Sequence, residues 1–368
     1  MKDLLRRLSR NRHPYEPLIS IEISRSRLLA NLHEYQKLAP GGLVAPVLKS
    51  NAYGHGLFEV ADVLKDEKGM PFFVVDSYFE ALALRSHGVK TPLLIIGYTR
   101  QETILKSTLN GVAFNITSIQ GLSSIAATHR KISIHIKVDT GMHRQGILPG
   151  EVAQAIEIIK NNPNLALEGI CTHLSDADNL DTAFTMSQIK QWNSIVGQFK
   201  KSFPAISYIH AANTDGSKFA KDIDCNMTRL GIGLYRGVLE MKTIITDVKS
   251  LKTGETVGYN NTFKAQKDMT IATIPVGYFE GLDRRLSSNG FVQVGPNKVA
   301  CPIVGRVSMN ITSIDVSAAN IKIGDEVVVT SHKMNDPNSM QAHAKRCGTI
   351  DYELYVRIPA HLKRIVVR

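Results

Sequence analysis

Residues 43–56, LVAPVLKSNAYGHG, join a short apolar segment to a lysine and then to small and polar residues. Similar apolar, β-branched segments recur as far as residue 235, and amphipathic stretches such as 151–161 and 183–201 lie between them. This alternation is typical of βα units around a parallel sheet. It predicts eight strands, at residues 43–49, 72–75, 93–97, 112–115, 132–138, 167–172, 206–210 and 228–235.

Eight such units favour a (β/α)8 barrel over a doubly wound sheet, which would show the same alternation. After residue 242 the segments alternate apolar with polar residues and break at Gly, Pro and Asn, as in a mainly antiparallel β domain. We therefore expect an α/β protein with an N-terminal (β/α)8 TIM-type barrel at 17–240 and a C-terminal β domain at 241–368. Residues 1–16 are expected to form a basic arm.

Length and composition agree with two soluble domains. The chain has 368 residues, of which 43% are hydrophobic and 21% charged. No apolar run reaches the roughly 18 to 20 residues that cross a bilayer, and the basic start lacks the apolar stretch of a signal peptide, so we expect a cytoplasmic protein without a membrane partner. The four cysteines stand far apart without a CxxC pair, which predicts reduced thiols and no metal site.

The net charge of +11 raises the question of nucleic acid. Residues 1–12 and 357–368 each carry +4, so the two ends hold eight of the eleven charges. Between them no basic run is interleaved with aromatic residues. Solvated termini are therefore the better interpretation, and no nucleic-acid partner is expected.

In a (β/α)8 barrel the chemistry lies where strands end and loops begin. Lys49 follows the first predicted strand, where an amine projecting into the barrel mouth is desolvated; its pKa then falls, which suits it to Schiff-base chemistry. A lone lysine at a strand end usually just extends its amine to solvent. Here the small and polar residues that follow, including Asn51, Tyr53 and Gly54, allow backbone and a phenol to approach a bound anion.

Other strand ends carry further candidates. Arg144 follows the fifth strand in KVDTGMHRQG and is able to hold a carboxylate, although a surface arginine on a turn is the more common case. His173 follows the sixth strand, where a histidine considered by itself is more often a structural core residue. Three groups after strands seven and eight would cradle a phosphate, with Arg229 beside them: Thr214 and the amides of Gly231 and Ile232. Together these residues suggest pyridoxal 5′-phosphate, a phosphate-bearing carbonyl cofactor that a lysine binds.

From about residue 17 to the C-terminus the sequence resembles the alanine racemase family of fold-type III pyridoxal-phosphate enzymes. The motifs occur in the family's order and at similar spacing: VLKSNAYGHG, KVDTGMHRQG, TRLGIGLY, GETVGYNNTF, IPVGYFEGLDRRLS, PIVGRVSMN and DYEL. The resemblance implies a (β/α)8 barrel, a C-terminal β domain and a head-to-tail homodimer. Each active site would then combine the barrel of one subunit with the β domain of the other.

The resemblance also implies residue roles. Lys49 and Tyr259 would be the two catalytic bases, on opposite faces of the substrate. The phosphate would be held by Tyr53, Thr214, Gly231, Ile232 and Tyr352. His173 would lie near the cofactor, and Arg229 would contact the pyridine nitrogen. The remaining roles concern the substrate side: Arg144 would hold the substrate carboxylate and lower the pKa of Tyr259, Lys137 (carbamylated in some members) would orient Arg144, and Tyr278 and Met309 would shape the substrate mouth.

Some positions depart from the family's pattern. The family's Asp after Met is Asn310, its GYADG is GYFEG with Phe279 and Glu280, and the Ser of the phosphate loop is Thr214. The stretch 235–241 is also shorter than in the family. Asn310 removes a charge beside the substrate, and we expect it to loosen specificity.

The implied activity is the interconversion of L- and D-alanine, which supplies D-alanine for peptidoglycan. Three alternatives stay open. A racemase of wider range would act on serine or another small amino acid, although the narrow mouth implied by Tyr278 and Tyr352 argues against large substrates. A basic-amino-acid decarboxylase is opposed by Arg229, and a non-catalytic pyridoxal-phosphate-binding protein is opposed by Tyr259 and the β domain.

Overall fold

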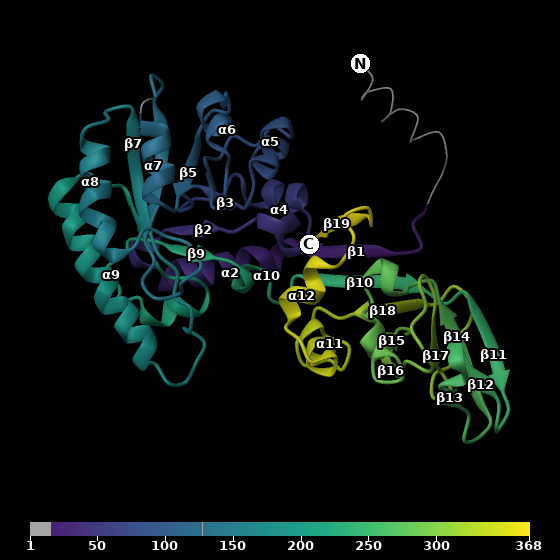
Figure 1. Ribbon diagram of the computed structural model, residues 1–368. Helices are drawn as coiled ribbons and strands as arrows, with labels where there is room; N and C mark the ends of the chain where they lie inside the picture. Colours follow the sequence, from purple (N-terminus) through teal and green to yellow (C-terminus); the bar gives the residue numbers. More distant parts are fainter. Residues whose placement is uncertain (1–15, 127) are drawn as a thin grey trace, which may run out of the picture. The chain divides into compact units, whose positions relative to one another are not determined.

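A computed structural model describes residues 16–126 and 128–368, which form two compact units (Figure 1). The barrel unit comprises residues 24–236. The β unit comprises residues 237–367 together with residues 16–23. The predicted basic arm lies outside the described residues, apart from Glu16.

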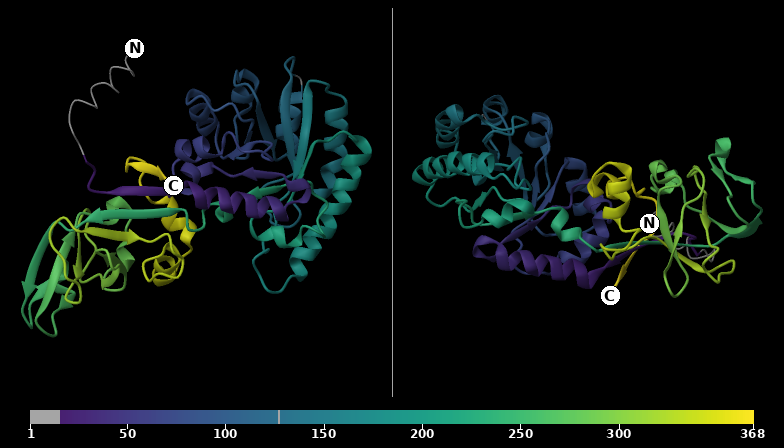
Figure 2. Two further views of the ribbon diagram at one scale, coloured as in Figure 1. Left: turned by 180° about the vertical axis from the view of Figure 1, so that it is seen from behind. Right: turned by 90° about the horizontal axis from the view of Figure 1, so that it is seen from below.

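The barrel unit contains eight short strands separated by helices. The strands are β2 (Val44–Pro46), β3 (Phe73–Val75), β4 (Leu93–Ile95), β5 (Val112–Ile116), β6 (Ile132–Lys137), β7 (Leu165–Cys171), β8 (Tyr208–His210) and β9 (Thr228–Leu230). The helices are α2 (Arg25–Leu38), α3 (Lys49–Tyr53), α4 (Leu57–Leu64), α5 (Tyr78–Ser86), α6 (Gln101–Lys106), α7 (Ile119–Ala126), α8 (Val152–Lys160), α9 (Ala183–Ser202) and α10 (Ile232–Tyr235). The longer helices lie on the outside of the strands (Figures 1 and 2).

The eight strands close into a parallel barrel. Strands β3 to β8 pair in chain order, and β2 pairs with β9. Two backbone hydrogen bonds join the pair β2–β9 to the other six strands. The Leu48 amide, after β2, donates to the Val74 carbonyl of β3 at 2.7 Å, and the Arg229 amide of β9 donates to the Ala212 carbonyl, after β8, at 3.0 Å. The predicted (β/α)8 barrel is therefore confirmed.

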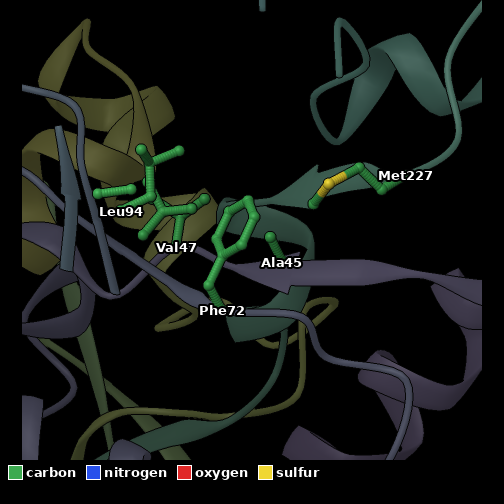
Figure 3. Packing of buried hydrophobic residues seen from close by; sticks show 7 residues of the cluster. Ala45, Val47, Phe72, Leu94 and Met227 are labelled. Atoms are coloured by element: carbon green, nitrogen blue, oxygen red, sulfur yellow. The ribbon is translucent and has the colours of Figure 1, made fainter. Parts of the chain in front are cut away.

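Apolar side chains fill one part of the barrel interior. The ring of Phe72, which precedes β3, lies beside Ala45 and Val47, with Leu94 and Met227 nearby (Figure 3). Parallel strands covered by helices bury both faces, which explains why the sequence shows them as continuous apolar runs. This cluster leaves the carboxyl ends of the strands to the polar residues of the site.

The predicted strands 43–49 and 228–235 extend furthest beyond the strands of the structure. Strand β2 ends at Pro46, three residues before Lys49, which begins the turn α3. Strand β9 ends at Leu230, because Gly231 leaves the extended conformation and the helical turn α10 follows. Lys49 and Ile232 therefore lie on turns beyond the strands.

The β unit is mainly antiparallel, as predicted. Its strands are β1 (Ser20–Ser24), β10 (Leu239–Ile244), β11 (Asp247–Leu251), β12 (Thr256–Val257), β13 (Phe263–Lys264), β14 (Met269–Ile274), β15 (Phe291–Val294), β16 (Val299–Pro302), β17 (Thr312–Asp315), β18 (Glu326–Thr330) and β19 (Arg364–Val367). The largest sheet has the order β16-β15-β18-β10-β1-β19, and β11, β14 and β17 form a second sheet. Two short helices, α11 (Met340–Cys347) and α12 (Asp351–Val356), complete the unit.

The division between the units differs from the predicted 17–240 and 241–368. Strand β1 pairs antiparallel with β10, from Ser20 opposite Lys242 to Ile23 opposite Leu239. Its alternating buried residues, Ile21 and Ile23, therefore belong to the core of the β unit. Local sequence does not reveal this, because the partner of β1 lies more than 200 positions further along the chain.

In the described part of the chain, no helix is long and apolar enough to cross a membrane.

The single tryptophan offers a test of barrel packing. Trp192 on α9 is fully buried, and its indole Nε1 donates to the Asp224 carbonyl at 3.0 Å. We expect Trp192→Phe to lower the free energy of unfolding by about 1–3 kcal/mol, because the carbonyl loses its donor and the smaller ring leaves a gap. Urea unfolding followed by circular dichroism measures this. An unchanged midpoint would contradict the assigned role of the indole.

Candidate active site

Lys49 stands at the start of an unusual turn. The four residues after it, Ser50 to Tyr53, all have φ between 52° and 56°, in the left-handed region. Left-handed backbone costs about 1–2 kcal/mol for each L-residue, and none of these four is glycine. Such strain persists only where the surroundings hold it, and it gathers at functional sites. The strain here fixes the direction in which Lys49 and Tyr53 leave the barrel wall.

Hydrogen bonds from neighbouring elements hold this turn. The Glu80 carboxylate on α5 accepts from the Asn51 amide at 3.3 Å and from the Asp76 amide at 2.9 Å. The side-chain oxygen of Asn51 accepts from the Leu57 amide at 2.8 Å. These bonds tie the turn to the end of β3 and to the start of α4, and so offset part of its conformational cost.

Four residues gather into a candidate phosphate cradle. A Cβ atom on Gly231 would lie 2.7 Å from the Tyr53 hydroxyl oxygen, so only glycine permits this approach. Nearby, the Gly233 amide donates to Oγ1 of Thr214 at 3.1 Å. Burial raises the pKa of Tyr53 to about 12, which keeps its hydroxyl a donor at neutral pH. Hydroxyls and close backbone amides are suited to bind a phosphate group.

Arg229 lies buried on β9 beside this cradle. Its Nη1 donates to Nδ1 and to the carbonyl oxygen of His210, at 2.8 and 2.7 Å. Its Nη2 donates to the carbonyl oxygens of Thr172 and Ala211, at 2.7 and 3.1 Å. Four of the five N–H groups are thus occupied, and Nε–H has no hydrogen-bond acceptor among the described residues. A donor without a protein acceptor is what a ligand ring nitrogen requires.

Two buried histidines continue from Arg229 into the barrel. Because a guanidinium only donates, Nδ1 of His210 accepts, and the proton of the neutral ring sits on Nε2. That proton then points to Nδ1 of His135, 2.8 Å away. Burial, and after it the charge of Arg229, lowers the pKa of His210 well below its usual value and that of His135 to about 3. The rings of Phe72 and Tyr208 pack on His135, where the polar chain meets the apolar cluster.

The ends of β6 and β7 supply three more predicted residues. Burial is the main cause that lowers the pKa of His173 to about 3, so this histidine is neutral at physiological pH, and its Nδ1 lies 3.3 Å from Nη2 of Arg229. Burial also lowers the pKa of Lys137. Arg144 is exposed on the following loop, where its charge acts on both Lys137 and His173. The expected contact that would orient Arg144 through Lys137 remains a prediction.

The remaining predicted residues belong to the β unit, where they are exposed or half-buried. Tyr259 is 68% exposed on a turn that Gly258 begins, Tyr278 is 43% exposed and Met309 is 56% exposed. Tyr352 on α12 is half-buried. The amide nitrogen of Asn310 donates to the carboxylate of Glu280 at 2.6 Å, a contact that the sequence did not indicate. The chain thus divides its predicted site residues between the two units.

Sequence reasoning missed three polar residues that the structure brings into the site. Glu80 anchors the turn after Lys49, and His210 and His135 extend the contacts of Arg229. The sequence did contain a signal for His210: it is the last residue of β8, just as Lys137 is the last residue of β6, and polar residues at strand ends are candidates for the site. Glu80 gives no local signal, since its role depends on a turn 29 positions earlier. His135 lies inside a strand, where an isolated histidine reads as a core residue.

The fold and these residues define a class of protein: a parallel (β/α)8 barrel with a lysine and a candidate anion cradle on the turns after its strands, followed by a mainly antiparallel β domain. Comparison with known proteins specifies the class further. Residues 23–238 match the family described as alanine racemase, N-terminal domain, and residues 238–366 match the alanine racemase, C-terminal domain. The chain belongs to the alanine racemase family, an enzyme family of isomerases.

Individual relatives agree. An alanine racemase of Methanococcus maripaludis is 34% identical, with 94% of this chain and 97% of the relative covered. The solved structure of an alanine racemase from Clostridium difficile 630 is similar with a TM-score of 0.88 at 27% identity, covering 96% of this chain and 97% of the other. A histidine racemase from Leuconostoc mesenteroides has a TM-score of 0.86 at 24% identity, covering 97% and 100%, which shows a shared fold alone.

The neutral buried histidines predict a specific pH dependence. His135 and His173 take up protons near pH 6.5 in the unfolded chain but only near pH 3 in the folded one. The unfolded state therefore binds more protons between these values, and stability should fall as the pH drops from about 6.5 towards 3. In His135→Gln the dependence of unfolding free energy on pH should weaken by about one proton in this window.

Urea unfolding of wild type and His135→Gln at several pH values measures this difference. Above about pH 7.5 both forms carry the same protons at this position, so their slopes should coincide there, which serves as the internal control. Equal slopes below pH 6 would contradict a neutral His135.

Proposed function

We propose that this protein is an amino-acid racemase that uses pyridoxal 5′-phosphate to interconvert L- and D-alanine. The observation that carries the proposal is the group formed by Lys49 on its left-handed turn, the cradle around Gly231, and the remaining N–H of Arg229. These three features lie in one unit. Lys49 would bind the carbonyl group of the cofactor, the cradle would bind its phosphate, and Arg229 would bind its ring nitrogen. Membership of the alanine racemase family supports the assignment.

The residues present fit the cofactor. The Tyr53 hydroxyl, Thr214 and the amides of Gly231 and Ile232 would hold its phosphate, Tyr352 would add a further hydroxyl, and Nε of Arg229 would donate to its ring nitrogen. When bound, pyridoxal phosphate withdraws electrons from the bonds to the amino-acid Cα and so makes the Cα proton acidic. Arg229 remains protonated at any physiological pH, which leaves the ring nitrogen an acceptor.

The chain's own residues would then move one proton between two faces. Racemisation requires that a proton leaves one face of Cα and that another returns to the opposite face. The Lys49 amine would serve one face, and the Tyr259 hydroxyl would serve the other. Arg144 would hold the substrate carboxylate and stabilise the Tyr259 phenolate, with Lys137 as its neighbour.

The exposure of the β-unit residues supports a homodimer with shared sites. A catalytic tyrosine needs a site that excludes water, yet Tyr259 is 68% exposed, and Tyr278 and Met309 are about half exposed. A second copy of the chain, related by twofold symmetry, would cover these residues with its barrel mouth. The head-to-tail arrangement expected from the family meets this requirement.

Alanine is the proposed main substrate because Tyr278, Tyr352 and Met309 would leave little space in the mouth. A wider range that includes serine is the second candidate, favoured by the neutral Asn310. We place the reaction in the cytoplasm, where it would supply D-alanine for peptidoglycan; the four free cysteines of the chain fit a reducing compartment. A chiral assay of the purified protein with a panel of L-amino acids decides between the two ranges.

The cofactor assignment predicts a covalent adduct. Protein purified with pyridoxal phosphate should be yellow, and borohydride should fix the cofactor on Lys49, because this amine stands beside the cradle. Peptide mass spectrometry locates the adduct, and Lys49→Ala is the control that should remain unlabelled there. An adduct on another lysine, or none, would refute the role of Lys49.

The shared site predicts complementation between inactive variants. Lys49→Ala and Tyr259→Ala should each be nearly inactive, because each removes one base. When the two are unfolded and refolded together, random pairing makes half the dimers mixed, and each mixed dimer has one site with both bases. About a quarter of all sites should therefore recover.

Alanine racemisation after refolding measures the recovery, with each variant refolded alone as the control. Native mass spectrometry reports the fraction of mixed dimers. Mixed dimers without recovered activity would show that the two bases do not act across subunits.

A further inference from the structure

The two carboxylate oxygens of Glu280, in the β unit, accept hydrogen bonds from different donors. Glu280 is only 7% exposed. Its Oε2 accepts from the Gly277 amide at 2.8 Å, and its Oε1 accepts from Nδ2 of Asn310 at 2.6 Å. No cation forms an ion pair with Glu280 in the described part of the chain. The Asn310 amide is therefore the side-chain donor that this buried carboxylate depends on.

The bond between Glu280 and Asn310 joins two loops that also meet through their backbones. The Tyr278 amide donates to the Ser308 carbonyl at 3.0 Å, and the Phe279 amide donates to the Met309 carbonyl at 2.9 Å. A Cβ atom on Gly277 would lie 2.2 Å from the Ser308 oxygen, so the loops approach as closely as glycine allows. The two loops carry Tyr278 and Met309, the side chains expected at the substrate mouth.

We propose that Glu280 and Asn310 form a matched pair that positions Tyr278 and Met309 for the substrate, an inference that rests on the proposed racemase function. Both oxygens of Glu280 accept, so the residue at 310 must donate, and an amide does so at every pH. An aspartate at 310 would place two acceptors face to face. Two of the departures from the family's motifs, Glu280 and Asn310, are therefore partners, and an effect of Asn310 on the substrate would pass through Glu280.

The charged groups on the adjoining segments have their own partners. Asp283, on the loop after Glu280, binds Arg285 at 2.8 Å and Arg357 at 3.0 Å. The ring of His361 lies 5.3 Å from that of Phe279, between ring centroids. Because His361 packs on this loop, the experiment compares variants at each pH instead of relying on one profile.

The experiment exchanges donor and acceptor between the two positions. In Asn310→Asp, two carboxylates face each other, and the KM for alanine should rise about five- to tenfold as Tyr278 and Met309 shift. The rise should become smaller at acidic pH, because two facing carboxylates that share a proton regain a hydrogen bond. Adding Glu280→Gln should remove most of this loss, since the new amide donates to Asp at 310 and still accepts from Gly277.

Asn289→Asp is the matched control, because Asn289 is an exposed asparagine of the same unit whose side-chain amide donates to a backbone carbonyl, that of Arg346, and not to a carboxylate. It makes the same charge change and should leave KM within about twofold of wild type. The proposal would be overturned if the Asn310→Asp variant had the wild-type KM for alanine at every pH. Losses that add in the double variant, instead of cancelling, would overturn it as well.

Hydrogen exchange separates this proposal from the proposed function. The Gly277 and Tyr278 amides should exchange faster in Asn310→Asp than in wild type, and the double variant should restore their protection. If wild type racemises no amino acid but exchange behaves in this way, the pair holds the loops and the proposed function fails. Unchanged exchange in an active enzyme would reject the pair alone.

Discussion

The guanidinium of Arg229 is the interaction on which the barrel side of the site depends. A buried charge is costly unless its donors are satisfied, and no carboxylate among the described residues forms an ion pair with Arg229. Carbonyl oxygens of Thr172, His210 and Ala211 serve instead, where β7 and β8 end. In a parallel barrel the carboxyl ends of all strands lie at the same end of the barrel. Backbone carbonyl oxygens there can accept hydrogen bonds from a cation, so a buried cation can be stabilised without a carboxylate. The absence of a neighbouring carboxylate keeps the positive charge available to a ligand.

Arg229 also affects the tautomer and the pKa of the histidines around it. A cation that cannot give up its proton forces Nδ1 of His210 to accept, and this fixes the tautomer of His210 and directs its proton to His135. His173 is kept neutral by burial and by the same charge. Burial is thus the main cause that keeps these histidines neutral, and the charge of Arg229 on β9 lowers their pKa values further, for His135 on β6, His210 on β8 and His173 on the loop after β7.

The strands could be predicted from sequence because buried parallel strands consist of apolar, β-branched residues, and each of the eight was located. The turn after Lys49 could not be, since Ser50 to Tyr53 have no glycine among them and their left-handed backbone depends on Glu80, far along the chain. Strand β1 was assigned to the barrel because its partner, β10, lies more than 200 positions away. Residue roles came mainly from motifs, whereas the contacts between residues such as Glu280 and Asn310 required the structure.

The two units hold their site residues under different physical conditions. In the barrel unit, burial shifts the pKa values of Tyr53, Lys137 and His173, so folding of one chain already sets the charge states of these side chains. In the β unit, Tyr259 and Met309 are exposed, and no burial prepares them for chemistry. What the β unit can control alone is the geometry of its loops, and the Glu280–Asn310 bond does this with an amide whose charge does not change with pH. If a site combines two such parts, folding of the barrel unit would fix the residues on the cofactor side. Association of two chains would then add the residues on the substrate side.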